Sequence, residues 1–148
     1  MSEHRATIEW TREGEFKYES YSRQHIWRFE GDVTVPGRAA PGNIPKTAPT
    51  APAVDPEQAF VASLSSCHML WFLHLACNRK YVIERYVDEP VGVLDKDWMA
   101  QVTLHPRVTF SGKAPSEEEH RALHEKAHER CFIARSVKTE VRVEPSIG

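Results

Sequence analysis

Three short runs near the start of the chain alternate hydrophobic and polar residues, at residues 6–11, 16–21 and 25–30. A period of two is typical of a strand with one buried face, and aromatic and β-branched residues favour strands. Turn-forming residues around Gly14 and Gly31 separate the runs. We therefore predict an antiparallel meander of three strands within residues 1–35.

The pattern changes at residues 36–55, where prolines become frequent. Six of the ten prolines lie between Pro36 and Pro56. Proline fixes φ and removes a backbone donor, so this density disfavours both a helix and a central strand. We predict a long extended connection inside a single domain that spans residues 1–148, because neither flank is long enough to fold well alone.

A long helix is predicted from Pro56 to about Arg79. Asp55 is a suitable N-cap, Pro56 fits the first helical position and Glu57 suits the positive end of the helix dipole. Apolar residues cover nearly every face, which is typical of a buried helix. A membrane span is disfavoured, because serine and histidine side chains interrupt the apolar stretch; these are Ser63, Ser65, Ser66, His68 and His74.

The rest of the chain predicts two strands, a helix and a last strand. The strands cover residues 81–94 and 98–110. Ser116 and Glu119 match a capping box, so a second helix should begin there and end near Cys131. Residues 136–143 alternate again. The order of helix, strands, helix and strand over residues 56–148 gives the whole chain an α+β fold.

Composition and charge narrow the class of function. The chain has 148 residues, with 19 basic and 21 acidic side chains and a formal net charge of -2. This balance offers no strong positive field for nucleic acid or for an anionic membrane. Three cysteines fit a reducing compartment better than a secreted disulfide scaffold, so we expect a cytoplasmic protein.

Two cysteines and several charged residues are candidates for chemistry. Cys67, in the middle of the first helix, is either a nucleophile or a small packing residue. Cys131 ends the second helix, where the negative dipole end disfavours a thiolate, so it suits the role of a partner thiol. Glu57 is either functional or a favourable helix-end charge. An arginine near the third strand, Arg23 or Arg28, is either functional or a solvated surface residue.

A metal site is a competing interpretation. His120, His124 and His128 recur every four residues along the second helix, and two histidines at this spacing can share a metal ion. The third lies one turn further, so one ion cannot easily take all three. A polar solvated helix face explains the same pattern. No CxxC or HExxH motif is present.

One segment resembles a known family. Residues 55–67, DPEQAFVASLSSC, are similar to the motif of osmotically inducible proteins and organic hydroperoxide resistance proteins (OsmC/Ohr), and AHERC at residues 127–131 resembles that family's second cysteine. The resemblance implies an intertwined homodimer, with antiparallel sheets packed on a long buried central helix and a second helix. Within the family, the residues that follow Cys67 look like those of a less characterised OsmC-like subgroup.

The resemblance also implies an activity. It predicts a thiol peroxidase in oxidative stress defence that reduces organic hydroperoxides, with hydrogen peroxide as a further substrate. Cys67 would be the peroxidatic cysteine, Cys131 the resolving cysteine and Glu57 the catalytic glutamate. The site arginine would be Arg23, with Arg28 as the alternative. No cofactor is implied, but an external dithiol would restore the thiols.

Two departures from the family bear on this prediction. Phe132 follows Cys131 where the family often has proline, and the proline-rich connection is longer than in compact members. Glu57 and Cys67 are also ten residues apart, about 15 Å along a helix. They can meet only if the helix breaks or if Glu57 comes from a second chain.

A binding protein that holds a small molecule without turnover stays open as an alternative, as does the metal-binding protein.

Overall fold

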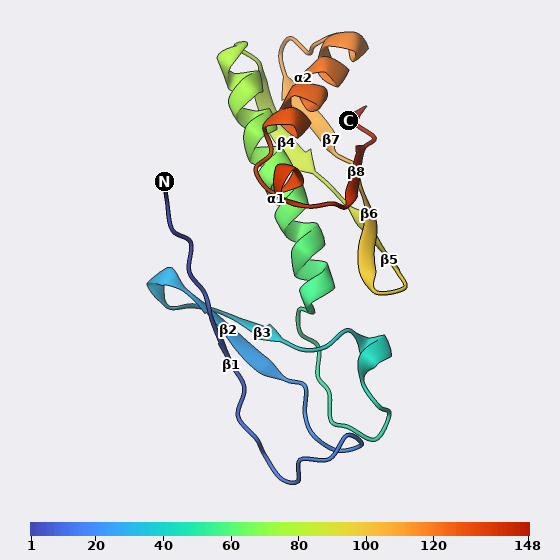
Figure 1. Cartoon of the computed structure of the whole chain (residues 1–148). Coiled ribbons are helices and arrows are strands. Elements are labelled where there is room, and N and C mark those ends of the chain that lie inside the picture. Colours follow the sequence, from blue (N-terminus) through green and yellow to red (C-terminus); the bar gives the residue numbers. More distant parts are fainter. The chain divides into compact units, whose positions relative to one another are not determined.

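The structure is a computed structural model that describes all 148 residues. Its contacts divide the chain into two compact units, Met1–Ala59 and Phe60–Gly148, and each is described by itself (Figure 1). The single domain expected from the sequence remains a prediction. The mixture of two helices with several small sheets is the α+β fold class that the sequence predicts.

The first unit contains a three-stranded antiparallel sheet in the order β1-β2-β3. Its strands are β1 (Thr7–Glu9), β2 (His25–Phe29) and β3 (Val33–Gly37). The strand predicted at residues 16–21 is wrong, because this segment is a loop with a turn. Its aromatic residues form a cluster of rings instead. The Phe16 ring centroid lies 5.7 Å from that of Trp10 and 4.9 Å from that of Tyr21.

The proline-rich connection is ordered by backbone hydrogen bonds. Its first residues extend β3, and a short 3-10 helix follows at Pro41–Asn43. Arg38 N donates to Val54 O at 3.0 Å, and Val54 N donates to Pro36 O at 2.9 Å. The two ends of this segment are therefore tied to each other immediately before the long helix begins.

The helix α1 (Pro56–Asn78) confirms the prediction and begins with a reciprocal cap. Gln58 N donates to Asp55 Oδ1 at 2.8 Å, and Asp55 N donates to Gln58 Oε1 at 3.2 Å. By length and composition α1 could cross a membrane, with a mean hydropathy of 1.4 over an 18-residue window. Core helices of soluble proteins meet the same criteria.

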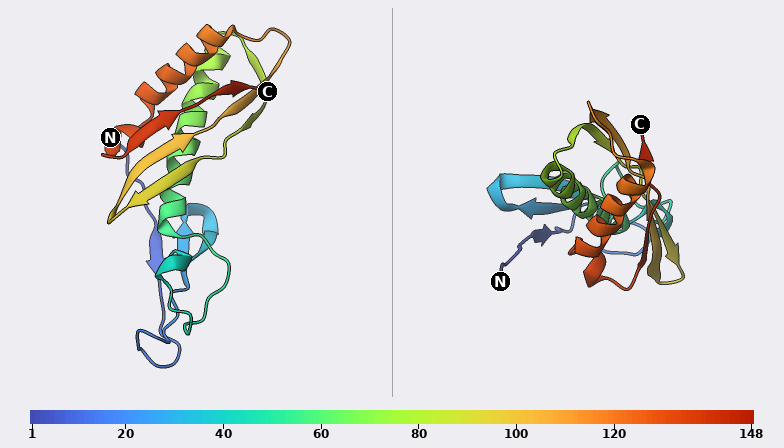
Figure 2. Two further views of the ribbon diagram at one scale, coloured as in Figure 1. Left: turned by 90° about the vertical axis from the view of Figure 1, so that its right-hand side faces the viewer. Right: turned by 90° about the horizontal axis from the view of Figure 1, so that it is seen from above.

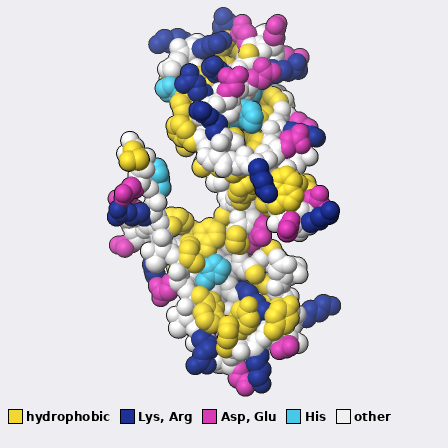
Figure 3. Space-filling view, in the orientation of Figure 1, with side chains coloured by type: hydrophobic (Ala, Val, Ile, Leu, Met, Phe, Trp, Pro, Cys, Tyr) yellow, Lys and Arg dark blue, Asp and Glu magenta, His cyan; other side chains and the backbone are white.

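The expectation that α1 is buried on all faces is wrong for the single chain. Only one stripe of α1 is buried, formed by Leu64, His68, Phe72 and Ala76. Leu70, on another face, is 60 % exposed. Hydrophobic side chains reach the surface in both units (Figure 3). Apolar side chains of α1 outside this stripe, such as Leu70, are therefore left exposed by the strands and the second helix of this unit.

The second unit holds two small sheets and the helix α2. Its strands are β4 (Val82–Val87), β5 (Val91–Asp95), β6 (Trp98–Leu104), β7 (Arg107–Ser111), β8 (Glu140–Val143) and β9 (Ser146–Ile147). Each of the two long strands predicted here is therefore two strands. Pro90 and Pro106 lie at the breaks, where the missing N–H cannot continue a ladder.

The strand orders are β4-β7-β9 and β5-β6-β8. The expectation of purely antiparallel sheets is wrong here, because β8 pairs in parallel with β6, and β9 in parallel with β7. Parallel neighbours need a crossover connection, and α2 (Glu117–Arg130) lies in it. Figure 2 shows α1 and α2 side by side against the strands.

The predicted start of α2 is confirmed at its N-cap. Glu119 N donates to Ser116 Oγ at 3.1 Å. The Glu119 carboxylate does not close the expected box and instead accepts a hydrogen bond from the Tyr81 hydroxyl at 2.6 Å. The helices meet in a core of Phe72, Ala76, Val108, Leu123 and Ala127. A second core lies around Leu64, Val102 and Leu104.

Candidate active site

One face of α1 presents a cysteine to an apolar cavity. Cys67, Leu70, Trp71 and His74 follow the spacing i, i+3, i+4, i+7, so they form one stripe along the helix. Together with Phe132 they line a cavity of about 270 Å³. Cys67 is half-buried. This stripe differs from the buried core stripe, so the thiol is held by a rigid helix and still remains accessible.

Cys131 lies where α2 ends. Its backbone N–H donates to Ala127 O at 3.0 Å, which closes the last turn of the helix. The side chain is 1 % exposed, and its Sγ accepts a hydrogen bond from Ala134 N at 3.4 Å. Burial raises the pKa of the Cys131 thiol to about 11, because a thiolate loses more solvation than a thiol, while the Ala134 hydrogen bond opposes this rise.

The two thiols lie close to each other in this unit. Besides burial, the nearby Cys67 thiol raises the pKa of Cys131. A neighbouring thiol has this effect only at short range, so the two side chains are near neighbours. The structure thus brings together the two cysteines that the sequence singles out. A disulfide between them forms when an oxidant removes two electrons and two protons from the pair.

Aromatic residues form the walls of the cavity. The rings of Trp71 and Phe132 make an edge contact with centroids 5.5 Å apart. The Arg130 guanidinium lies 5.9 Å from the Trp71 ring centroid, within the range of a cation–π contact. Phe132, which departs from the family's proline, is 64 % exposed at this wall. It therefore contributes to the binding surface.

Glu57, in the first turn of α1, has a carboxylate oxygen without a hydrogen-bond partner. Its Oε2 atom is buried and makes no hydrogen bond. Buried polar atoms are rarely left in this state, so the carboxylate is suited to a donor from elsewhere. The helix is continuous from Pro56 to Asn78, which removes the option of a helix break. Glu57 and Cys67 of one chain therefore remain about 15 Å apart along α1.

Neither candidate arginine pairs with Glu57 in the single chain. Arg23 is buried, and its Nη1 donates to the carbonyls of Tyr18 at 2.9 Å and Tyr21 at 2.7 Å. Its guanidinium also lies 3.5 Å from the Tyr21 ring centroid. Arg28 Nε is 3.5 Å from Glu9 Oε2 in an exposed ion pair. No ion pair between Glu57 and either arginine is thus formed in the single chain.

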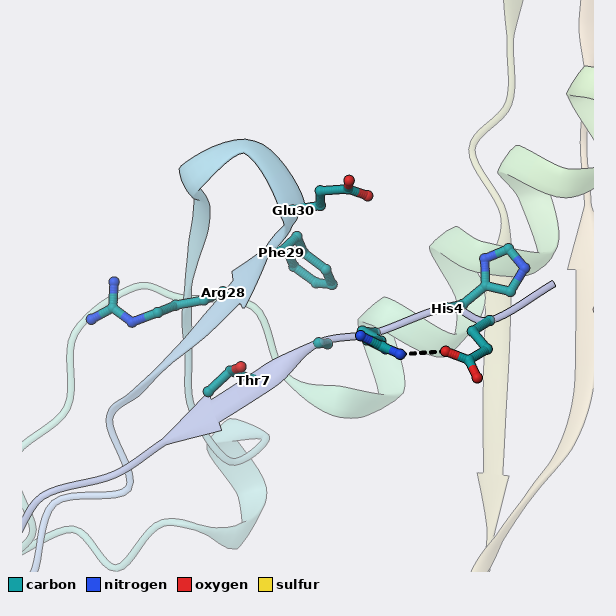
Figure 4. A pocket seen from close by; sticks show the side chains of 8 residues that line it. His4, Thr7, Arg28, Phe29 and Glu30 are labelled. Atoms are coloured by element: carbon teal, nitrogen blue, oxygen red, sulfur yellow. Dashed lines mark hydrogen bonds and ion pairs between the residues drawn. The ribbon is translucent and has the colours of Figure 1, made fainter.

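The first unit also contains an open hollow of about 950 Å³. It is lined by Glu3, His4, Arg5, Ala6, Thr7, Arg28, Phe29 and Glu30. Figure 4 shows Arg28, Phe29 and Glu30 on one side of this hollow and Thr7 of β1 on the other. No cysteine lines this hollow, and its charged residues are exposed, so we do not assign the chemistry to it.

The histidines of α2 do not form a metal site. No group of three histidine, cysteine, aspartate or glutamate side chains converges in the structure. His124 instead bonds to His68 of α1, with 2.9 Å between His68 Nε2 and His124 Nδ1. His68 was missed as a candidate at the level of sequence. The available signal was its position in the stripe of Leu64, Phe72 and Ala76, where it is the one polar residue.

The arrangement supports two-thiol chemistry. A half-buried thiol lines an apolar cavity, and a buried second thiol, whose pKa is raised, lies near it. A thiolate is the reactive form, and oxidation to a sulfenic acid beside a second thiol leads to a disulfide. A cation near Cys67 would favour the thiolate, but the second unit offers none in an observed contact with it.

Comparison with known proteins gives one family. The family model described as OsmC-like protein matches residues 49–146. An OsmC-like protein of unknown function from Vibrio cholerae is 42 % identical, with a TM-score of 0.92, and the match covers 98 % of this chain and 99 % of that one. No curated protein matches.

More distant structures share the fold alone. An organic hydroperoxide resistance protein from Legionella pneumophila has 19 % identity and a TM-score of 0.65, over 100 % of this chain and 99 % of that one. One from Bacillus subtilis has 18 % identity and a TM-score of 0.60, over 97 % and 98 % of the two chains.

Proposed function

Because the chain belongs to the OsmC-like protein family, we propose that it is a cysteine-based peroxidase that reduces organic hydroperoxides. Fold relatives described as organic hydroperoxide resistance proteins support the reaction class. The observation that carries the proposal is the proximity of Cys67 to Cys131 beside an apolar, aromatic cavity. Such a cavity favours an alkyl or aryl hydroperoxide, and hydrogen peroxide is the smaller alternative substrate.

The reaction follows from the two thiols. The Cys67 thiolate attacks the terminal peroxide oxygen, the O–O bond breaks, and the alkoxide takes a proton and leaves as an alcohol. Cys67 is then a sulfenic acid. The Cys131 sulfur attacks the Cys67 sulfur, the S–O bond breaks, and the hydroxide takes the Cys131 proton to leave as water. An external dithiol reduces the resulting disulfide by exchange and is itself oxidised.

We also propose that the working form is a homodimer with two composite sites. The exposed apolar faces of α1 support this, since a second copy would remove them from water. The unpaired Glu57 carboxylate supports it as well. In the dimer, Glu57 would hold the guanidinium of Arg23, or of Arg28, beside a Cys67 thiolate of the other chain. Sedimentation should show no folded monomer at micromolar concentration.

The protein is proposed to act in the cytoplasm as a soluble enzyme without a bound cofactor, in oxidative stress defence. Three free cysteines support a reducing compartment. Family membership supports a soluble protein, since α1 is here the central helix of the fold. The dithiol reductant is the partner that the cycle requires. No proposal for nucleic acid or membrane binding follows from the net charge of -2.

A thiol count tests the peroxidase. The reduced protein is treated with one equivalent of cumene hydroperoxide, then alkylated and weighed by intact mass spectrometry. We expect wild type and Cys77→Ser each to lose two alkylatable thiols, with the bridge mapped to Cys67 and Cys131. Cys77 is exposed at the end of α1, so it is the matched control. Cys131→Ser should stop at a sulfenic acid that dimedone traps.

Two outcomes would refute the proposal. One is a folded wild type that keeps all three thiols for many minutes. The other is a Cys67→Ser variant that still consumes the hydroperoxide. The first result favours the alternative, a small-molecule binding protein that uses the same cavity without turnover, and the second removes Cys67 from the reaction.

A further inference from the structure

A chain of three buried histidines joins the two helices that carry the thiols. His68 comes from α1, and His124 and His120 come from α2. His124 Nδ1 lies 2.9 Å from His68 Nε2, and His124 Nε2 lies 3.2 Å from His120 Nε2. The three side chains are at most 3 % exposed. His124 also stacks on Phe72, with ring centroids 4.0 Å apart.

The His68–His124 contact is the only side-chain hydrogen bond between α1 and α2. Apart from the Arg130–Trp71 cation–π contact and the rings that His120 and His124 pack on Phe72, the packing between these helices is apolar, with Ala76, Leu123 and Ala127. Apolar packing depends little on direction, so small shifts along the helices change it little. A hydrogen bond weakens steeply when its distance or angle changes. This one bond is therefore suited to fix the register between the helices.

That register also determines the geometry of the thiols. His68 directly follows Cys67 in α1. Cys131 follows His124 by seven residues, two turns along the same helix. We propose that His68 and His124 are positioning residues, whose hydrogen bond keeps α1 and α2 in the register that places Cys67 and Cys131 close together. This inference rests on the proposed two-thiol reaction and assigns its second step, disulfide formation, to the histidine pair.

The environment requires the histidine chain to be neutral. The charges that act on the rings all come from other histidines: His128 acts on His68, and His68 and His120 act on His124. Tyr86 of β4 and Phe110 of β7 pack against Phe72 and His120 and contribute no carboxylate. A protonated ring would be a buried charge without a counterion, which is strongly unfavourable. Burial accordingly lowers the pKa of His68 to about 4.

Two substitutions at position 68 separate the hydrogen bond from packing. His68→Gln places an amide near the position of Nε2, whereas His68→Met has a similar length and shape but no strong donor or acceptor. Diamide takes two electrons and two protons from a pair of adjacent thiols, so it tests their geometry without a hydroperoxide. We expect diamide to form the Cys67–Cys131 bridge at least ten-fold more slowly in His68→Met, and His68→Gln to restore the rate to within three-fold.

The hydroperoxide reaction gives a second, independent measurement. Sulfenic acid formation on Cys67 should change less than two-fold in both variants, while the following disulfide step slows only in His68→Met. His105→Gln, exposed and outside both helices, is the control and should change neither step.

The outcomes distinguish the two proposals. Equal diamide rates in folded wild type and His68→Met overturn the positioning role, whatever happens with hydroperoxide. Slow bridging in His68→Met together with no hydroperoxide reaction in wild type supports the positioning role and refutes the peroxidase. If His68→Met does not fold, His124→Met removes the other partner of the same hydrogen bond, and a diamide rate in folded His124→Met equal to that of wild type overturns the proposal.

Discussion

The protonated state of Cys131 leads to a quantitative prediction about its reactivity. Its thiol has a pKa of about 11, raised from 9.0 chiefly by burial and further by Cys67. At pH 8 a thiol of pKa 9.0 is about 9 % thiolate, while one of pKa 11 is about 0.1 % thiolate. Because only the thiolate reacts, Cys131 in the reduced protein should be alkylated about 90-fold more slowly than a free thiol. Its 1 % exposure slows it further.

The assay is timed alkylation with iodoacetamide, followed by peptide mass spectrometry. Exposed Cys77 reports reagent quality in the same molecule, and Cys131→Ser identifies the slow phase. The Cys131 rate should rise about ten-fold per pH unit between pH 8 and pH 10. Labelling of Cys131 within five-fold of Cys77 at pH 8, or a rate that does not rise with pH, would refute this account of the thiol pair.

Three further predictions concern stability and are measured by urea denaturation at fixed protein concentration. The His68 pKa of about 4 in the fold lies below 6.5, so the unfolded chain binds more protons between these values, and stability should fall as pH drops through this window. His68 alone contributes about 2 kcal/mol of this loss at pH 5, and buried His124, whose pKa is also lowered, adds to it; His4→Gln, at an exposed position, should keep this dependence. Phe72→Ala, which empties a fully buried position against His124, should cost about 3–5 kcal/mol, and exposed Glu118→Ala under about 0.5 kcal/mol. Ser116→Ala removes the α2 cap and should cost about 1 kcal/mol, with Ser116→Asp retaining most of the stability.

Local signals were enough to predict the helices. Asp55, Pro56 and Ser116 are capping residues whose effect is decided within one turn, and both helices begin where these residues predict. Strands were harder to predict because the same alternation can serve a loop cluster, as at Phe16 and Tyr21. The parallel pairing of β8 with β6 depends on a crossover between distant segments, which no local pattern encodes.

The candidate site was only partly predictable for a similar reason. The two cysteines were identified from spacing and resemblance, and their proximity follows from the packing of α1 on α2. The His68–His124 bond joins positions 56 residues apart. A local pattern does not reveal such a distant partner. The four-residue spacing of the α2 histidines suggested a metal site, whereas His124 in fact bonds to His68 of the other helix. Arg23 is held by the carbonyls of its own loop, an interaction between backbone and side chain that residue type does not predict.

The thiol pair also links the redox state to the strength of the fold. Cys67 and Cys131 lie 64 positions apart, so a bridge between them would close most of the second unit into a covalent ring. By chain entropy such a ring stabilises the folded state by about 4 kcal/mol. The same free energy stabilises the bridge, because a fold that favours the disulfide resists its reduction. The reduced protein is then the more easily unfolded form. The dithiol that reduces the bridge must therefore supply this additional folding free energy as well as break the S–S bond.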